Sequence, residues 1–170
     1  MRKQNRLSVA LNEIKERYND LIDIHRTRLE ELLTVLEKLR TSEPEKQAEI
    51  VNSLVEKIFS FSEFLDQLEI WAYDVGSLEI AGNTIDKSVS SFSSQVKEEV
   101  EILEEVKASS RDLVKTKGLD TKLTRSVRNA FIKSTSRLKE VSSKVKEYGE
   151  QLFDLISKRK GLIDSSIDRL

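Results

Sequence analysis

The chain has a single histidine, His25, and no cysteine, and this narrows the chemistry open to it. A di-iron helical bundle needs paired Glu-x-x-His motifs, and a zinc site needs several nitrogen or sulfur ligands. One histidine cannot supply either set. The sequence also lacks a nucleotide-binding glycine loop and the Gly-x-Ser-x-Gly nucleophile motif. We therefore expect no catalytic residue, no metal site and no cofactor, and predict that the protein is not an enzyme.

Acidic residues cluster in KEEVEILEEV, residues 97–106, where carboxylates could in principle hold Mg²⁺. Glu98, Glu101 and Glu105 follow each other at intervals of three and four residues, so they fall on one face of a helix. This spacing favours a charged face in contact with solvent over a metal site.

Basic residues concentrate between positions 111 and 128. The candidates for binding a polyanion are Arg111, Lys115, Lys117, Lys122, Arg125 and Arg128. Residues 107–146 carry twelve basic and three acidic side chains, whereas residues 41–106 carry fifteen acidic and four basic ones, although the formal net charge is −1. Three explanations stay open: neutralisation by acids of the same chain, contact with phosphates of nucleic acid or lipid, and docking on the acidic flank of another copy.

The surroundings of these basic residues argue against specific recognition of bases. No tyrosine or tryptophan lies near them to stack on bases, and no zinc-finger or short helix-turn-helix signature occurs. Membrane-surface contact is not favoured, because no wedge of aromatic residues accompanies the basic ones. Any nucleic-acid binding is expected to be nonspecific and to act through phosphate contacts.

Apolar residues recur at alternating steps of four and three, the period of helices packed lengthwise. Only one proline and five glycines interrupt the chain. The pattern predicts helices over about residues 7–40, 43–75, 84–117 and 121–160, with a short tail at 162–170. We predict one all-α domain, residues 1–170, folded as an elongated antiparallel four-helix bundle made of two long helical hairpins with coiled-coil-like packing.

Local signals set the predicted helix boundaries. Ser42 and Glu45 form a capping-box pattern around Pro44, which marks the start of the second helix. Gly161 is expected to end or bend the fourth helix. Residues 78–81, between the second and third helices, fit either flank.

Opposite charges suggest a register for the second hairpin. A turn centred near Leu119 would bring three ion pairs together: Glu105 with Lys133, Glu101 with Arg137, and Glu99 with Lys139. The turn between the first two helices would lie at the same end of an up-down-up-down bundle, so its acids could neutralise part of the basic stretch.

His25 and Arg28 stand at positions of the first helix where the period calls for apolar residues. A turn near residue 42 would place Arg28 beside Glu56, and His25 near Phe59 and Ser60. We interpret the pair as polar groups that fix the register of the bundle. A ligand-binding or proton-transfer role for His25 is the alternative.

Half of the ten aromatic residues lie in one stretch of fifteen: Phe59, Phe61, Phe64, Trp71 and Tyr73. Helical spacing assigns most of them to the core. Their spread around more than one helix face leaves candidates for a subunit interface, which are Phe59, Phe64, Trp71 and Tyr73.

The sequence lacks a signal-peptide core and any run of about 18 apolar residues, so we expect a soluble, cytoplasmic protein. We predict a non-catalytic helical scaffold or interaction protein that acts through protein–protein contacts, with a partner or with itself, as a homo-oligomer. The alternative is a sequence-nonspecific nucleic-acid-binding protein that uses the basic end of the third and fourth helices.

Overall fold

The computed structural model describes residues 2–78, 83–116 and 121–168, which form four long α-helices and one short 3-10 turn. The elements are α1 (Arg2–Thr41), η1 (Pro44–Lys46), α2 (Gln47–Ser77), α3 (Asn83–Lys115) and α4 (Thr121–Asp168). No strand occurs in the described ranges. The prediction of an all-α four-helix bundle is confirmed.

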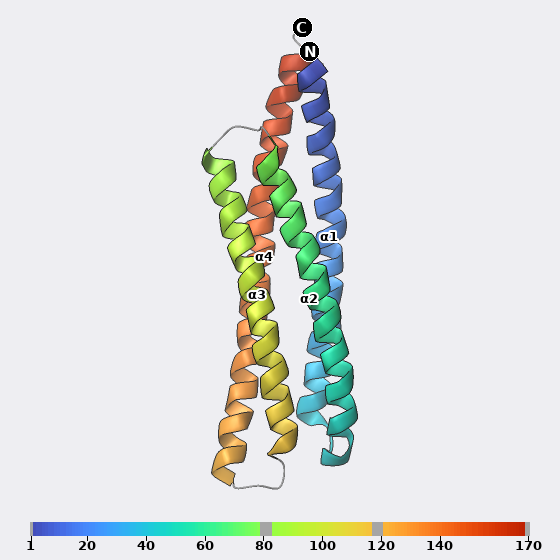
Figure 1. Ribbon diagram of the computed structural model, residues 1–170, viewed down its shortest axis with the longest axis vertical. Helices are drawn as coiled ribbons and strands as arrows, with labels where there is room; N and C mark the ends of the chain where they lie inside the picture. The colour runs from blue at the N-terminus through green and yellow to red at the C-terminus, as the bar shows by residue number, and fades with distance from the viewer. Residues whose placement is uncertain (1, 79–82, 117–120, 169–170) are drawn as a thin grey trace.

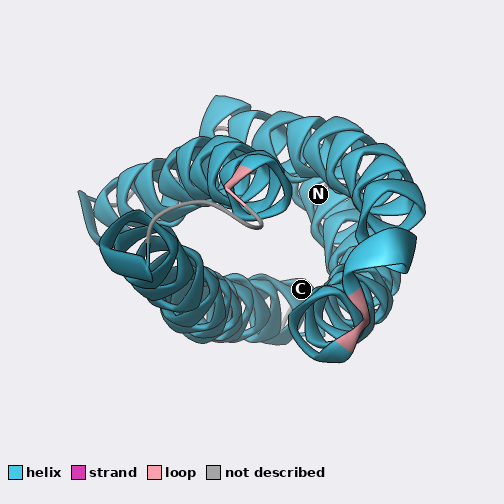
Figure 2. Cartoon of the chain, turned by 90° about the horizontal axis from the view of Figure 1, so that it is seen from below, coloured by secondary structure: helices cyan, strands magenta, loops and turns pink. Residues whose placement is uncertain are grey.

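The helices form an elongated up-down-up-down bundle (Figure 1). Each helix packs against its neighbours in the chain, and α1 closes the bundle by packing against α4. Viewed along the long axis, the four helices surround a common core, with α1 diagonal to α3 and α2 diagonal to α4 (Figure 2). The turn after α1 and the adjoining ends of α3 and α4 lie at the same end, as expected (Figure 1).

The core consists mainly of the residues that the apolar period picked out. On α2 the main apolar series is buried: Val51, Leu54, Ile58, Phe61, Leu65, Leu68, Ala72 and Val75. Of the residues expected to widen this apolar face, Phe64 and Trp71 are buried, Val55 is partly buried and Phe59 is exposed. Trp71, Phe61 and Phe92 are the largest fully buried side chains. Each buried large apolar side chain contributes about 1.5–3 kcal/mol, so the helices are stabilised chiefly by packing along these faces.

The second helix begins later than the capping pattern predicted. α1 continues to Thr41, and the Ser42 hydroxyl donates back to the Leu39 carbonyl oxygen at 3.4 Å. Ser42 therefore serves the end of α1 and not the start of α2. Pro44 opens the 3-10 turn, and α2 starts at Gln47 without a side-chain cap.

The fourth helix does not end at Gly161, and the predicted tail is helical as far as Asp168. Ile163 is buried and Ile167 packs against the core, so the apolar face continues past the glycine. Asp164 accepts a hydrogen bond from Ser8 of α1, which ties this end of α4 to the bundle, and another from Lys160 of its own helix. Packing of this face outweighs the cost of about 1 kcal/mol for a glycine inside a helix.

The register of α3 against α4 differs from the prediction by about one turn. Arg137 forms an ion pair with Glu105 and not with Glu101. The hydroxyls of Ser109 and Ser134 meet across the same contact, with 2.7 Å between their oxygens. Among these described residues, the predicted pairs Glu105–Lys133 and Glu99–Lys139 do not form.

Three boundary predictions fall partly outside the described ranges. The residues concerned are 79–81 of the link after α2, Lys117 and Gly118 at the predicted end of the third helix, and Leu119 at the predicted turn. Within the described helices, no segment is both long and apolar enough to cross a bilayer.

Gly149 lets α4 approach the aromatic residues of the core closely. A Cβ atom at this position would lie 2.8 Å from the Tyr18 hydroxyl oxygen and 3.1 Å from a ring carbon of Phe92. A Cβ atom at Gly161 would meet nothing within 4 Å. Close packing of the core therefore requires a glycine at position 149 but not at position 161.

We predict opposite effects for two matched substitutions. Gly161→Ala should stabilise the protein by about 1 kcal/mol, because alanine has the higher helix propensity and the site has room. Gly149→Ala should destabilise it by about 1–3 kcal/mol, because the new methyl group overpacks the core. Urea unfolding of both variants measures this, and a Gly149→Ala protein as stable as Gly161→Ala would contradict the packing around Tyr18.

Candidate functional site

A buried polar cluster joins three helices in the middle of the bundle. His25 of α1 is 3% exposed and Glu99 of α3 is 0% exposed. His25 Nε2 lies 2.9 and 3.1 Å from the two carboxylate oxygens of Glu99, and Ser142 of α4 donates from Oγ to Glu99 Oε1 at 2.6 Å. Because a carboxylate only accepts hydrogen bonds, Nε2 carries the hydrogen. Donors from two helices thus hold a carboxylate on a third, which offsets the cost of burying it.

The remaining helix, α2, contributes the apolar wall of this cluster. The His25 ring packs edge-on against Phe61 of α2, with 5.4 Å between ring centroids, and Phe64 lies 6.4 Å away. His25 was predicted near Phe59 and Ser60, so it lies deeper than expected. Arg28 does not meet Glu56 as predicted, and lies 3.8 Å from Glu31 of its own helix.

The order of hydrogen bonds decides what this cluster can do chemically. In a serine nucleophile site the hydroxyl donates to histidine, which takes its proton. Here Ser142 donates to Glu99, and the Nε2 of His25 donates to the same carboxylate. The arrangement fixes the positions of the three groups and does not activate the hydroxyl. The described residues also contain no group of three or more side chains that could hold a metal ion.

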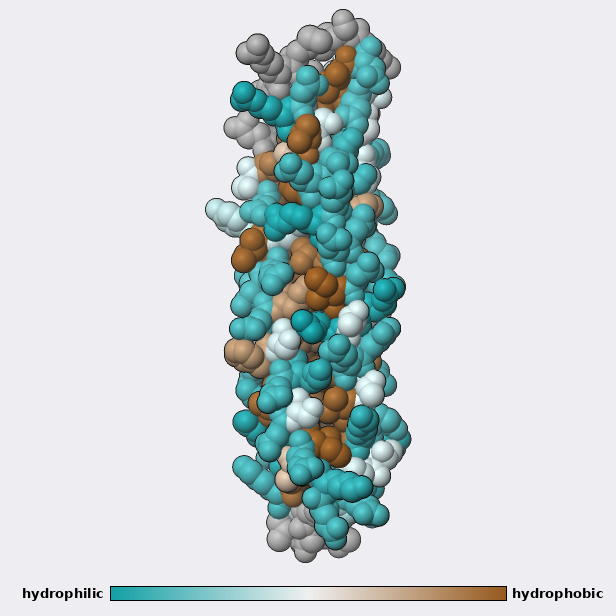
Figure 3. Space-filling model, turned by 90° about the vertical axis from the view of Figure 1, so that its right-hand side faces the viewer, coloured by the Kyte–Doolittle hydropathy of each residue, from teal (hydrophilic) through white to brown (hydrophobic). Residues whose placement is uncertain are grey.

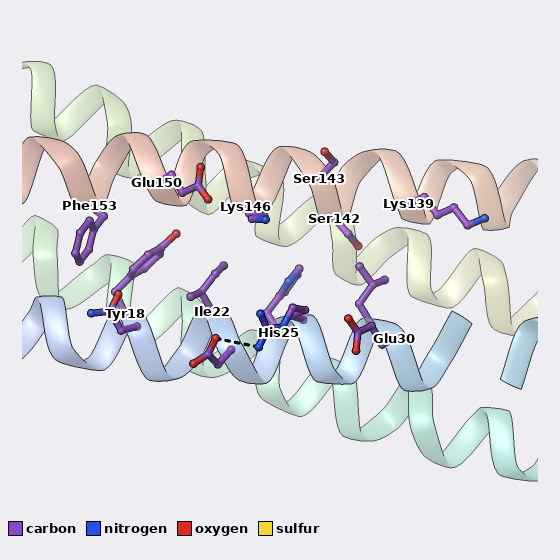
Figure 4. A pocket seen from close by; sticks show the side chains of 14 residues that line it. Tyr18, Ile22, His25, Glu30, Lys139, Ser142, Ser143, Lys146, Glu150 and Phe153 are labelled. Atoms are coloured by element: carbon purple, nitrogen blue, oxygen red, sulfur yellow. Dashed lines mark ion pairs between the residues drawn. The ribbon is translucent and has the colours of Figure 1, made fainter. Parts of the chain in front are cut away.

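A cavity of about 470 Å³ between α1 and α4 leads from the surface to this cluster. Tyr18, Ile22 and His25 project from α1 toward α4, and Ser142 and Phe153 project back (Figure 4). The charged side chains on its rim are Asp23, Glu30, Glu150, Arg26, Lys139 and Lys146. Acids and bases are equal in number, so the rim does not select for the charge of a ligand.

Tyr18 forms part of the wall of this cavity. Its ring lies 5.1 Å from both Trp71 and Phe153, measured between centroids, and its hydroxyl is buried without a hydrogen-bond partner. Burial raises the pKa of the Tyr18 phenol well above its usual value, and the charges of Glu150 and Asp154 add to this. The hydroxyl therefore stays protonated in the folded protein.

A second groove, of about 440 Å³, lies between α1 and α4 closer to the basic end of the bundle. We call it the acceptor groove; its lining residues are Leu33, Leu36, Glu37, Arg40, Phe131, Ile132, Thr135, Ser136 and Lys139. The hydrogen bond from Arg40, together with the charges of Arg40 and Lys139, holds the pKa of Glu37 below its usual range. Glu37 is thus neutralised locally and leaves the groove with a net positive rim.

The predicted polyanion-binding residues lie at the same end, on α3 and α4. Those described are exposed: Arg111, Lys115, Lys122, Arg125 and Arg128. Lys117 lies outside the described residues. No ion pair forms at Arg111, Lys115, Arg125 or Arg128 within the described part of the chain. Within that part of the chain, these four side chains therefore make no direct contact with an acid.

The four aromatic interface candidates separate into two kinds. Phe64 and Trp71 are 4% and 0% exposed, and Trp71 Nε1 donates to the Ile14 carbonyl oxygen at 3.0 Å, so both belong to the core and cannot form an interface. Phe59 and Tyr73 are 64% and 75% exposed. Ile70, which is not among the predicted candidates, is 55% exposed and joins them on the outer face of α2.

Comparisons with known proteins give no indication of function. The chain matches no protein-family model, no curated protein and no solved structure. Functional inference therefore depends on the surfaces and the buried cluster described above.

We predict strong coupling between His25 and Glu99. His25→Leu or Glu99→Leu alone should each destabilise the protein by about 3–5 kcal/mol, because each leaves a buried polar group without its partner. The double variant should lose much less than the sum. A double-mutant cycle from urea unfolding measures the coupling. Glu105→Ala with Arg137→Ala, an exposed pair, serves as control and should give at most about 1 kcal/mol. Additive losses at His25 and Glu99 would contradict the cluster.

Tyr18 should make the protein sensitive to alkaline pH. In the unfolded chain tyrosine loses its proton near pH 10, whereas the raised pKa keeps Tyr18 protonated in the folded state. The contribution of Tyr18 to the free energy of unfolding is therefore fully present below about pH 10. Above that pH it falls by up to about 1.4 kcal/mol per pH unit. Tyr18→Phe should remove this part of the slope in unfolding experiments between pH 9 and 11 (about one unit on either side of the usual value). Equal slopes for wild type and Tyr18→Phe would refute the assignment.

Proposed function

We propose that this protein is a non-catalytic helical scaffold that works by self-association, with the outer face of α2 as the contact surface. The observation that carries the proposal is the exposure of three large apolar side chains on one helix face. Phe59, Ile70 and Tyr73 are 64%, 55% and 75% exposed. At 100° per residue they fall within about 60° of one another, opposite the core positions of α2.

The surroundings of these three residues support a protein contact. We call the set Phe59, Ile70 and Tyr73 the α2 stripe; it spans about 21 Å along the helix at 1.5 Å per residue. Exposed aromatic residues are enriched at protein interfaces. On the side of the bundle where α1 and α2 lie, hydrophobic side chains stand in small separate groups among hydrophilic ones (Figure 3). This favours a contact of moderate area that can form and dissociate.

A second copy is the partner that the charges favour. Glu56, Glu63 and Asp66 lie beside the α2 stripe, are exposed, and form no ion pair within the described residues. The same chain carries Arg125 and Arg128 on α4, which are exposed and form no ion pair with any residue that the structure describes. The acidic surface of one copy can therefore contact the basic surface of a second copy.

The non-catalytic part of the proposal is supported by the buried cluster. Ser142 donates to Glu99 and not to His25, so the one histidine does not act on the nearby hydroxyl. The cluster instead links α1, α3 and α4, which is the role of a register-fixing polar group.

Removing the α2 stripe should weaken self-association. The wild type should show a mass that rises with concentration in light scattering. Phe59→Ser combined with Tyr73→Ser should raise the apparent dissociation constant at least about tenfold, since buried aromatic residues dominate interface energies. Leu162→Ser, which removes an apolar side chain of similar exposure (59%) on α4, should have little effect. A wild type that stays monomeric at about millimolar concentration would exclude the proposal.

Nonspecific nucleic-acid binding is the second candidate function. It is supported by the exposure of Arg111, Lys115, Arg125 and Arg128 at one end of the bundle without ion pairs in the described part of the chain. Such binding would act through phosphate contacts and weaken steeply with salt. Charge reversal at Arg125 and Arg128, with both nucleic-acid binding and mass measured, separates the two candidates.

A further inference from the structure

We propose that the α2 stripe of one copy docks in the acceptor groove between α1 and α4 of a second copy, beside Arg125 and Arg128. This inference depends on the proposed self-association and names the surface that receives the stripe. It gives a role to the acceptor groove and to Arg125 and Arg128, none of which belongs to the buried cluster.

The charges of the two surfaces are opposite. The α2 stripe is flanked by three acids, Glu56, Glu63 and Asp66, without a base on that face. The acceptor groove carries Arg40 and Lys139 against the single acid Glu37. Arg128 and Arg125 lie one and two turns from Ile132 on the same side of α4, and both are exposed. Arg40 is paired with Glu37, so Lys139, Arg125 and Arg128 remain to face the three acids across the proposed contact.

The apolar parts of the two surfaces also match. The floor of the acceptor groove is formed by Leu33, Leu36 and Phe131, with Ile132 at 48% exposure on its edge. A groove of about 440 Å³ has room for an aromatic side chain such as Phe59 or Tyr73. From Arg125 to Lys139 the basic side of α4 spans about 21 Å, the same length as the α2 stripe. One helix face can therefore lie along the other.

The positions of the two surfaces determine the type of assembly. α2 and α4 occupy diagonal corners of the bundle, and the α2 stripe faces away from the core. A single chain cannot bring its own stripe to its own acceptor groove. The contact is heterologous, with different surfaces on the two partners, so each added copy leaves one stripe and one groove free. Assembly continues into a filament unless the rotation between copies closes a ring.

Two variants that each disable one surface test this arrangement. Arg125→Glu with Arg128→Glu removes the receiving charge, and Phe59→Ser with Tyr73→Ser removes the stripe. Each variant alone should associate at least about tenfold more weakly than the wild type. An equimolar mixture of the two should form a 1:1 complex and nothing larger, because one intact stripe meets one intact groove. Sedimentation velocity at low and high salt measures the masses, with weaker association expected at high salt.

Two further variants serve as controls for general effects of charge. Lys144→Glu with Lys158→Glu makes the same charge change at exposed positions elsewhere on α4 and should leave association unchanged. Adding Glu63→Arg and Asp66→Arg to the Arg125→Glu, Arg128→Glu protein exchanges the charges and should restore association. Circular dichroism of every variant checks that the helices are intact.

Each other outcome identifies what has failed. A monomeric wild type removes the proposed function and this inference with it. If the wild type associates but the Arg125→Glu, Arg128→Glu protein does so equally well, the proposed function stands and the acceptor groove is not the receiving surface. The same holds if a mixture of the two surface variants stays monomeric. If charge reversal abolishes only salt-sensitive binding of duplex DNA, the arginines serve nucleic acid instead.

Discussion

The register of the bundle depends on a carboxylate without access to water. Glu99 is fully buried, so it must keep its hydrogen bonds to His25 on α1 and Ser142 on α4. Sliding either helix by one turn, about 5.4 Å, would leave this charge without a partner at a cost of several kcal/mol. Exposed ion pairs such as Arg137–Glu105 contribute at most about 1 kcal/mol each. The buried cluster around Glu99 therefore outweighs the surface pairs in selecting the alignment of α1, α3 and α4.

The number, type and approximate length of the helices could be predicted from the apolar period alone, because four long amphipathic faces leave few other ways to bury themselves. The register of α3 against α4 could not be predicted in this way. An apolar face that repeats every three to four residues looks almost the same after a shift of one turn, and this is the size of the error between α3 and α4. The predicted end at Gly161 failed for a related reason. Glycine propensity is a local term of about 1 kcal/mol, and the buried Ile163 beyond it restores the helix through packing.

The buried cluster has a signal in the sequence, which is the helical spacing of its ionisable residues. Glu99 follows Phe92 and Val96 at the spacing of core positions, and Leu103 and Val106 continue the series. The predicted register of the second hairpin instead pairs Glu99 with Lys139. His25 stands at a core position of α1 in the same way, so two ionisable residues in the apolar series of different helices were candidates for a pair. Helical phase would also have separated Phe59 and Tyr73 from Phe64 and Trp71, since the first two lie about half a turn from the core face.

The separation of charge along the chain has a physical consequence for how copies of the protein meet. With a formal net charge of −1, two copies do not repel each other strongly, so local complementarity decides their orientation. An acidic apolar face on α2 and a basic apolar groove beside α4 lie on opposite corners of a bundle whose register is held from inside by His25 and Glu99. A shift of α1 against α4 would move Leu33 and Leu36 past Phe131 and change the shape of the acceptor groove. The buried cluster thus links the internal alignment of the helices to the surface that the protein presents.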